Sequence, residues 1–102
     1  MNNNEVILLL DFYESLLTDK QIEIMKYHYE DDLSLSEIAE NLDVSRSAVS
    51  DLIKRTLNQL TQYEDKLKLV ANYRKRAMIY EEMLKLNDSR ITKLVDALKE
   101  SE

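Results

Sequence analysis

Hydrophobic residues recur at helical spacing from the first residues of the chain onward. Between Asn4 and Leu17 they include Val6, Leu9 and Tyr13, which are three and four residues apart and therefore predict one amphipathic helix. Further apolar residues widen this stripe beyond one face. A helix that is apolar over most of its circumference requires burial on two sides, either in the centre of a core or in a dimer contact.

Polar residues predict where the next two helices begin. Thr18 and Gln21, and again Ser34 and Glu37, have the spacing of a capping box, in which each side chain satisfies a free backbone N–H of the other. The acidic run of residues 30–32 predicts the end of the second helix, because negative charge at a helix C-terminus opposes the helix dipole. A short third helix then extends to about residue 42.

The third and fourth helices are separated by about three residues, and Ser45 can cap the fourth. Two short helices that cross at a wide angle need a small side chain at the crossing, and Ala39 supplies it. Apolar residues stand around this alanine at the spacing of a helix-turn-helix, in which the second helix enters the DNA major groove. These residues are Ile38, Leu42, Val44, Val49 and Leu52.

No residue type interrupts the helical pattern between Thr61 and Leu86. The sequence leaves open whether one helix continues from Ser45 to Leu86 or bends near Thr61. A heptad-like seam in this segment favours packing against a partner, although two heptads are fewer than a coiled coil usually has. The seam consists of Val70, Tyr73, Ala77, Tyr80 and Leu84.

Residues 87–89 predict a break, after which Asp88 or Ser89 can cap a last short helix. Its expected apolar stripe consists of Ile91, Leu94, Val95 and Leu98.

The composition supports an all-helical fold and excludes several kinds of site. The 102 residues contain no Gly, Pro or Cys and a single histidine, His28. Without Gly, the tight turns of hairpins and barrels and the phosphate-binding glycine loops lack their usual residue. Thiolate and histidine-rich metal sites are excluded as well. We therefore expect no metal, no cofactor and no catalytic residue, and hence no enzyme; His28 is expected to be structural.

Charge is distributed unevenly along the chain. The net charge is −6, but residues 1–43 carry −9, residues 44–76 carry +5 and residues 77–102 carry −2. A basic segment within an acidic protein is typical of a nucleic-acid contact, although a solvated helix face explains it equally well. The longest apolar run, Val6 to Leu10, is too short to span a membrane. We expect no signal peptide and a cytoplasmic protein.

The outward face of the fourth helix contains the candidate site residues. At about 100° per residue, the face opposite Val49 is polar at its start and basic further along. In a DNA groove this order places one group of residues near base edges and another near phosphates. The base-facing candidates are Arg46, Ser47, Ser50 and Asp51, and the phosphate-facing candidates are Ser45, Lys54 and Arg55.

A family resemblance rests on these same segments. LSLSEIAENLDVSRSAVSDLIKRTLNQL (33–60) resembles the fourth region of bacterial sigma factors, which reads promoter −35 elements. With DFYESLLTDKQ (11–21), HYEDDLSLSEIAE (28–40), DVSRSAVSDLIKRT (43–56) and YEDKLKL (63–69), the chain is similar to the YlxM family of small helix-turn-helix proteins. This resemblance implies a non-enzymatic DNA-binding regulatory protein. It also implies a role in the signal recognition particle pathway, so the alternative is a module that binds the particle's GTPase or its RNA.

The departures from sigma factors predict weak DNA binding by a single chain. Asp43 stands where sigma factors usually have Gly, and Asp51 repels phosphate, which leaves Arg46 as the one strong base reader. Two chains would double a weak contact. We therefore expect a helix-turn-helix domain in residues 1–60, a helical extension in residues 61–102 that serves dimerisation, and a homodimer that binds DNA.

Overall fold

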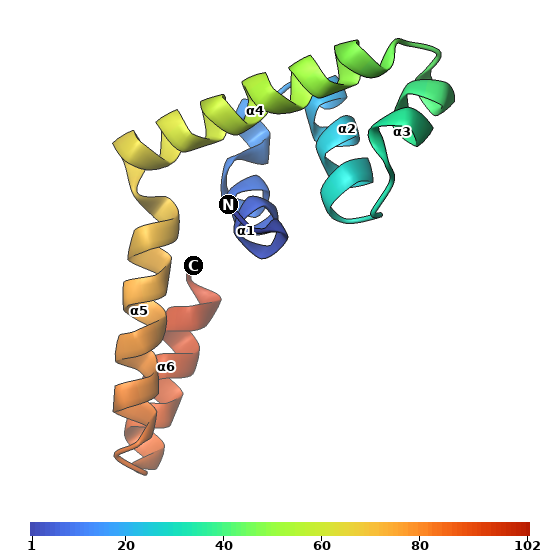
Figure 1. Cartoon of the computed structure of the whole chain (residues 1–102). Coiled ribbons are helices and arrows are strands. Elements are labelled where there is room, and N and C mark those ends of the chain that lie inside the picture. The colour runs from blue at the N-terminus through green and yellow to red at the C-terminus, as the bar shows by residue number, and fades with distance from the viewer. The chain divides into compact units, whose positions relative to one another are not determined.

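The computed structural model describes all 102 residues and consists of helices and turns without a strand (Figure 1). The predicted all-α fold is confirmed. The helices are α1 (Asn3–Tyr13), η1 (Glu14–Leu16, a 3₁₀ turn), α2 (Asp19–Tyr29), α3 (Leu35–Leu42), α4 (Arg46–Leu67), α5 (Leu69–Leu84) and α6 (Ser89–Glu100). By packing, the chain forms two compact units, Met1–Val70 and Ala71–Glu102, which are described separately.

The predicted helix starts are confirmed at the level of individual hydrogen bonds. Thr18 and Gln21 form one capping box, and Ser34 and Glu37 form the other. The Ser45 hydroxyl accepts a hydrogen bond from the Ala48 N–H at 3.1 Å. Asp88 caps α6 by accepting from the Arg90 N–H at 2.9 Å. These caps are local, so the sequence alone specifies them.

Four non-glycine residues adopt the left-handed backbone conformation that is usually found at Gly. They follow α2, α3, α4 and α5 in turn, and each has φ between 53° and 57°. They are Asp32, Asp43, Lys68 and Asn87. Because the chain has no Gly, every reversal after α2 depends on a residue that adopts this conformation at some cost.

In the first unit, α1, α2 and α3 all pack against α4 (Figure 1). Their contacts enclose a single apolar core in which the largest fully buried side chain is Tyr13. The broad apolar face of α1 is therefore explained by core burial, the first of the two alternatives that its sequence left open. Thr56 is the one buried polar residue, and its hydroxyl donates to the Leu52 carbonyl at 2.8 Å and accepts from Gln21 Nε2 at 3.2 Å.

The helix from Ser45 onward does not continue to Leu86, nor does it bend at Thr61; it ends at Leu67. Lys68 adopts the left-handed conformation and α5 begins at Leu69. Two side chains stabilise this break by capping the new helix. The Tyr13 hydroxyl accepts a hydrogen bond from the Leu69 N–H at 3.1 Å and donates one to Glu64 Oε1 at 2.6 Å. The same oxygen of Glu64 also accepts a hydrogen bond from the Val70 N–H at 3.0 Å.

In the second unit, α5 and α6 form an antiparallel helical hairpin (Figure 1). Tyr80 on α5 and Val95 on α6 are its buried apolar residues. Two residues of the seam that was expected to contact a partner are thus buried within the chain itself, Val70 in the core of the first unit and Tyr80 in the hairpin. The stripe expected on α6 is buried only at Val95, because Leu94 and Leu98 remain 61% and 45% exposed.

Candidate nucleic-acid interface

The corner between α3 and α4 is built as its sequence pattern predicts. Ala39 is buried at 7% exposure and Val49 is fully buried, so the small side chain lies inside where the two helices meet. Asp43 ends α3 in the left-handed conformation, and the Val44 N–H then donates to the Ala39 carbonyl at 3.0 Å. The α3–α4 pair is therefore a helix-turn-helix with α4 as its second helix.

One expectation about this corner is wrong. Val44 is one of the apolar residues that the helix-turn-helix pattern places around Ala39, and it was expected to be packed there, but its side chain is 45% exposed. The left-handed turn at Asp43 directs the Val44 backbone N–H toward Ala39, so the contribution of Val44 comes from its backbone.

The face of α4 opposite the core is open. Arg46, Ser47, Asp51, Lys54 and Arg55 are exposed, as is the cap residue Ser45, and Ser50 is half-buried. The seven predicted site residues lie within the cap and the first ten residues of α4. Ser47, Asp51 and Lys54 are opposite the buried Val49, Ser50 and Arg55 are at the flanks of this face, and Arg46 and the cap residue Ser45 are at the start of the helix.

The three cations of this face have no acidic partner. Every ion pair of the chain lies elsewhere, so Arg46, Lys54 and Arg55 are unpaired, and they outnumber the one carboxylate of this face, Asp51, by three to one. Unpaired cations spaced along one helix face are what a phosphodiester backbone requires.

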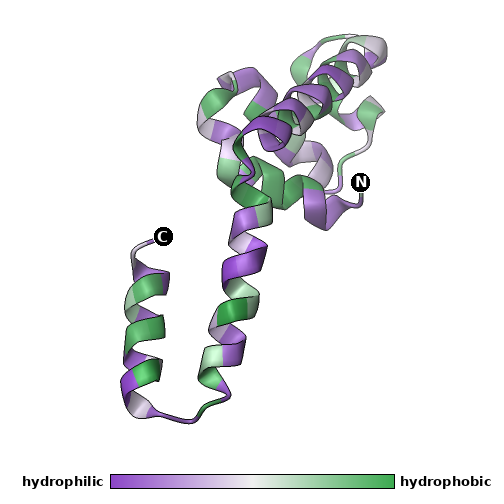
Figure 2. Ribbon diagram, turned by 90° about the vertical axis from the view of Figure 1, so that its left-hand side faces the viewer, coloured by the Kyte–Doolittle hydropathy of each residue, from purple (hydrophilic) through white to green (hydrophobic).

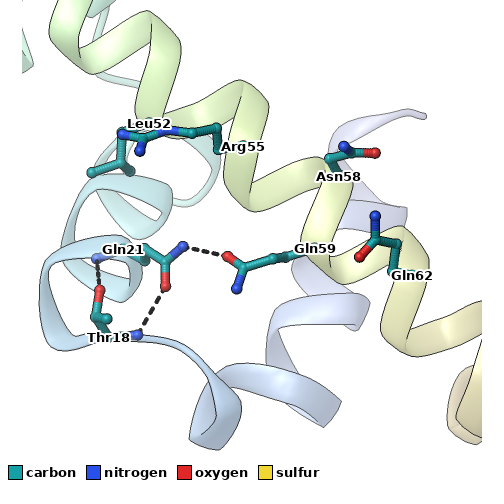
Figure 3. Close-up of a pocket in the computed structure, with 7 residues that line it drawn as sticks. All are labelled: Thr18, Gln21, Leu52, Arg55, Asn58, Gln59 and Gln62. Atoms are coloured by element: carbon teal, nitrogen blue, oxygen red, sulfur yellow. Dashed lines mark hydrogen bonds between the residues drawn. The ribbon is translucent and has the colours of Figure 1, made fainter.

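A polar hollow of about 570 Å³ continues this face toward α2 (Figure 3). Arg55, Asn58 and Gln62 from α4 line it, with Thr18 and Gln21 on the opposite wall. Gln21 Nε2 donates to Gln59 Oε1 at 2.6 Å and so joins α2 to α4 beneath the hollow. Guanidinium and amide groups of this kind donate to phosphates and to base edges.

The helical pattern placed Asn58 on the outward side of α4, but neither Asn58 nor Gln62 was counted among the candidate site residues. Asn58 and Gln62 are four residues apart on the same face as Lys54, so their helical spacing was a usable signal. The contribution of Thr18 and Gln21 was not visible, because it depends on α2 packing across α4.

Titratable groups with displaced pKa values lie outside this face. Hydrogen bonds from the backbone and hydroxyl of Ser34 lower the pKa of Glu37. Burial, together with the hydrogen bond to Glu64, raises the pKa of Tyr13, and burial raises the pKa of Tyr29. Glu37 belongs to the cap of α3, Tyr13 belongs to the core, and Tyr29 packs against the core.

His28 has a structural position. Its Nδ1 donates to the Leu33 carbonyl at 2.9 Å, and its ring packs edge-on against Tyr29 with 4.9 Å between ring centroids. No group of acidic or histidine side chains is arranged to hold a metal ion. The chain also contains no helix that is long and apolar enough to cross a membrane.

The fold and the open face of α4 define a helix-turn-helix protein. The profile of the UPF0122 family, described as "Putative helix-turn-helix protein, YlxM / p13 like", matches residues 1–100. The chain belongs to this family, and the resemblance seen in its sequence is confirmed.

Individual relatives agree with this assignment. A UPF0122 protein of Halalkalibacterium halodurans is 51% identical over 84 residues, which are 82% of this chain and 77% of the relative. A UPF0122 protein of Bacillus licheniformis is 50% identical and covers 89% of this chain and 87% of its own length. One from Malacoplasma penetrans is 44% identical over 97% of this chain and 87% of its own length.

Proposed function

We propose that the protein is a non-enzymatic regulatory protein that binds duplex DNA through α4. The observation that carries this proposal is the row of unpaired cations, Arg46, Lys54 and Arg55, on the exposed side of a helix-turn-helix. Arg46 stands in the first turn of α4, where a side chain reaches base edges, and Lys54 and Arg55 stand two turns later beside the phosphates.

The remaining α4 residues define how selective this contact is. Ser47 and Ser50 have short side chains that donate or accept with any base, whereas Asp51 can only accept a hydrogen bond, and its usual partner is the amine at cytosine N4. Asn58 and Gln62 extend the polar face past the cations. The protein therefore binds DNA through charge with modest sequence preference. It acts in the cytoplasm, where bacterial DNA lies.

Two chains act together in this proposal. The first unit, Met1–Val70, contains the DNA-binding helix-turn-helix, and the hairpin of the second unit, Ala71–Glu102, pairs two copies. Pairing doubles the number of cations on the duplex, so a weak contact per chain becomes a useful one.

Fluorescence anisotropy with a pool of labelled random duplexes at low salt tests the proposal. The variant Arg46→Ala/Lys54→Ala/Arg55→Ala removes the cations of the α4 face, and Lys20→Ala/Lys66→Ala/Lys93→Ala removes three exposed cations elsewhere. We expect the α4 variant to lose binding at least about tenfold relative to the control, since both lose the same charge. Equal binding by the two variants, or no binding by the natural chain, would refute DNA binding by α4.

The alternative function is a module that binds the signal recognition particle, either its GTPase or its RNA. The net charge of −9 in residues 1–43 supports it, because an acidic surface suits a basic protein partner. Affinity capture from a bacterial lysate, with and without ribonuclease and deoxyribonuclease, separates the two functions. Recovery of the particle favours the alternative, and recovery of DNA that deoxyribonuclease abolishes favours the proposed function.

A further inference from the structure

The helical hairpin of the second unit leaves large apolar side chains uncovered. Ile79 is 57% exposed, Leu94 is 61% exposed and Leu98 is 45% exposed. Hydrophobic residues lie on both helices of the hairpin (Figure 2). Two helices alone cannot enclose a core, and within this unit only Tyr80 and Val95 are buried.

These exposed residues lie on one face. Ile79 precedes the buried Tyr80 by one residue, and Leu94 precedes the buried Val95 by one residue. One residue is a rotation of about 100° in the same sense in each helix. Because α5 and α6 are antiparallel, this rotation leads to the same side of the hairpin.

The next turn of each helix repeats the arrangement. The half-buried Met83 follows Tyr80 by three residues, and Leu98 follows Val95 by three. We call Ile79, Met83, Leu94 and Leu98 the hairpin face. The opposite side of the hairpin is charged, since Glu81 and Asp96 directly follow the two buried residues and point the other way. The hairpin is therefore half of a four-helix bundle, with an apolar layer of matched position on its two helices.

We propose that a second copy of this chain covers the hairpin face, so that two hairpins form an antiparallel four-helix bundle about a twofold axis. This inference rests on the pairing of two chains in the proposed function, and it names the surface through which the two chains contact each other. It also replaces the pairing seam expected from the sequence, because that seam lies partly inside the hairpin at Tyr80.

Charge complementarity favours a second copy as the occupant. Lys75 and Glu82 lie four residues before and three residues after Ile79, both on the exposed outer edge of α5, where the largely exposed Glu82 also pairs with Lys85 of its own chain at 3.2 Å. When two α5 helices pair antiparallel around Ile79, Lys75 of each copy lies opposite Glu82 of the other. A twofold interface needs this kind of self-complementarity.

The nearly balanced charge of residues 71–102 also favours pairing between two copies of the hairpin. Residues 71–102 carry seven Lys and Arg against six Asp and Glu, whereas residues 1–70 carry seven against fourteen. Two hairpins therefore meet without net repulsion. The exposed large apolar residues of the first unit, by contrast, are scattered over different elements and form no comparable surface; they are Met1, Leu16, Val44, Leu67 and Leu69.

Light scattering of the full chain after size exclusion tests the inference, and neighbouring residues supply a matched control. Ile79→Lys and Met78→Lys introduce the same charge one residue apart, but Met78, which is 71% exposed, points away from α6. We expect the mass of two chains for the natural protein and for Met78→Lys. For Ile79→Lys and Leu94→Lys we expect a dissociation constant raised at least about tenfold, with helix content unchanged by circular dichroism.

A charge swap distinguishes the loss of a contact between two copies from unfolding of the hairpin, either of which would weaken the dimer. Lys75→Glu alone should weaken the dimer, and Lys75→Glu combined with Glu82→Lys should restore it, because only a copy that contacts itself regains the pair. A monomeric natural chain, equal behaviour of Ile79→Lys and Met78→Lys, or a swap that fails to restore the dimer would overturn the inference.

The test is separate from that of DNA binding. The Arg46→Ala/Lys54→Ala/Arg55→Ala variant should remain a dimer. A dimeric natural protein that fails to bind DNA would refute the proposed function and leave the hairpin face intact.

Discussion

Asp43 shows at the scale of one residue how the corner of the helix-turn-helix is made without Gly. Its φ of 55° and ψ of 48° place it in the left-handed region, where a β-carbon has a steric cost that is smallest for Asp and Asn. The Asp43 and Val44 N–H groups both return to carbonyls at the end of α3, so the conformation closes the helix. The corner thus carries some strain that Gly would relieve.

We expect Asp43→Gly to stabilise the protein by about 0.5–1 kcal/mol, the relief of strain being partly offset by the greater freedom of Gly in the unfolded chain. Asp43→Ala should instead destabilise it by about 1 kcal/mol, because alanine lacks the tolerance of Asp for this region. Urea denaturation measures both. Two variants of equal stability would contradict a strained corner.

Glu37 predicts a pH dependence of stability. Its pKa is lowered in the folded chain by the Ser34 hydrogen bonds, so in acid the unfolded chain binds more protons than the folded one. The contribution of Glu37 is therefore complete above its unfolded pKa of about 4.3 and is lost as pH falls through the lowered value. Other carboxylates titrate in the same range, so a variant must isolate this one.

Glu37→Gln provides that control, because the first capping box of the same chain already uses Gln21 at this position. We expect the natural protein to lose more stability than Glu37→Gln between about pH 5 and pH 3. Urea midpoints across this range measure the difference. Parallel pH profiles would show that Glu37 has no such linkage.

At the scale of helices, the break between α4 and α5 depends on two side chains from distant parts of the sequence. Tyr13 on α1 and Glu64 on α4 are 51 residues apart, and together they accept the first N–H groups of α5. The Tyr13 side chain is fully buried, and both hydrogen bonds of its hydroxyl are partly buried, so water replaces them less well than it would at the surface.

Tyr13→Phe should lower the free energy of unfolding by about 1.5–3 kcal/mol, because it removes a hydrogen bond to a carboxylate and leaves the Leu69 N–H unpaired. Tyr63→Phe is a matched control. The two rings lie 5.9 Å apart, but the hydrogen bonds of Tyr63 are long, at 3.5 Å, so its loss should cost little. Chemical denaturation gives both values, and equal losses would argue against the junction.

Features that depend on residues close together in the sequence were predicted, whereas features that depend on residues far apart in the sequence were not. The capping residues Thr18, Ser34, Ser45 and Asp88 act within three residues, and each was predicted. The end of α4 at Leu67 was not, because it needs Tyr13. The residues of the α4 face were found by helical period, whereas the wall supplied by Thr18 and Gln21 required the packing of α2.

At the scale of the whole molecule, a chain of net charge −6 that binds DNA must do so through a local positive surface. Lys54 and Arg55 are the proposed phosphate contacts, and two chains supply four such cations. Each phosphate contact releases bound counterions, so the logarithm of the binding constant falls with the logarithm of salt by about 0.9 for each contact.

We therefore expect a slope of about −3.6 for the natural dimer on duplex DNA. Lys54→Ala should reduce its magnitude by about 1.8 because it removes one contact from each chain, and Ser47→Ala should leave it unchanged. Anisotropy titrations between about 50 and 200 mM salt measure the slopes. A slope insensitive to Lys54→Ala would exclude this side chain from the phosphate contact.

The four left-handed residues have a spectroscopic consequence. At positive φ the amide proton and α-proton of one residue lie unusually close, which gives a strong intraresidue Overhauser signal that helical residues lack. Asp32, Asp43, Lys68 and Asn87 each stand at a different helix boundary. Nuclear magnetic resonance could thus follow the four junctions one at a time as the protein is heated or binds a partner, with no label introduced.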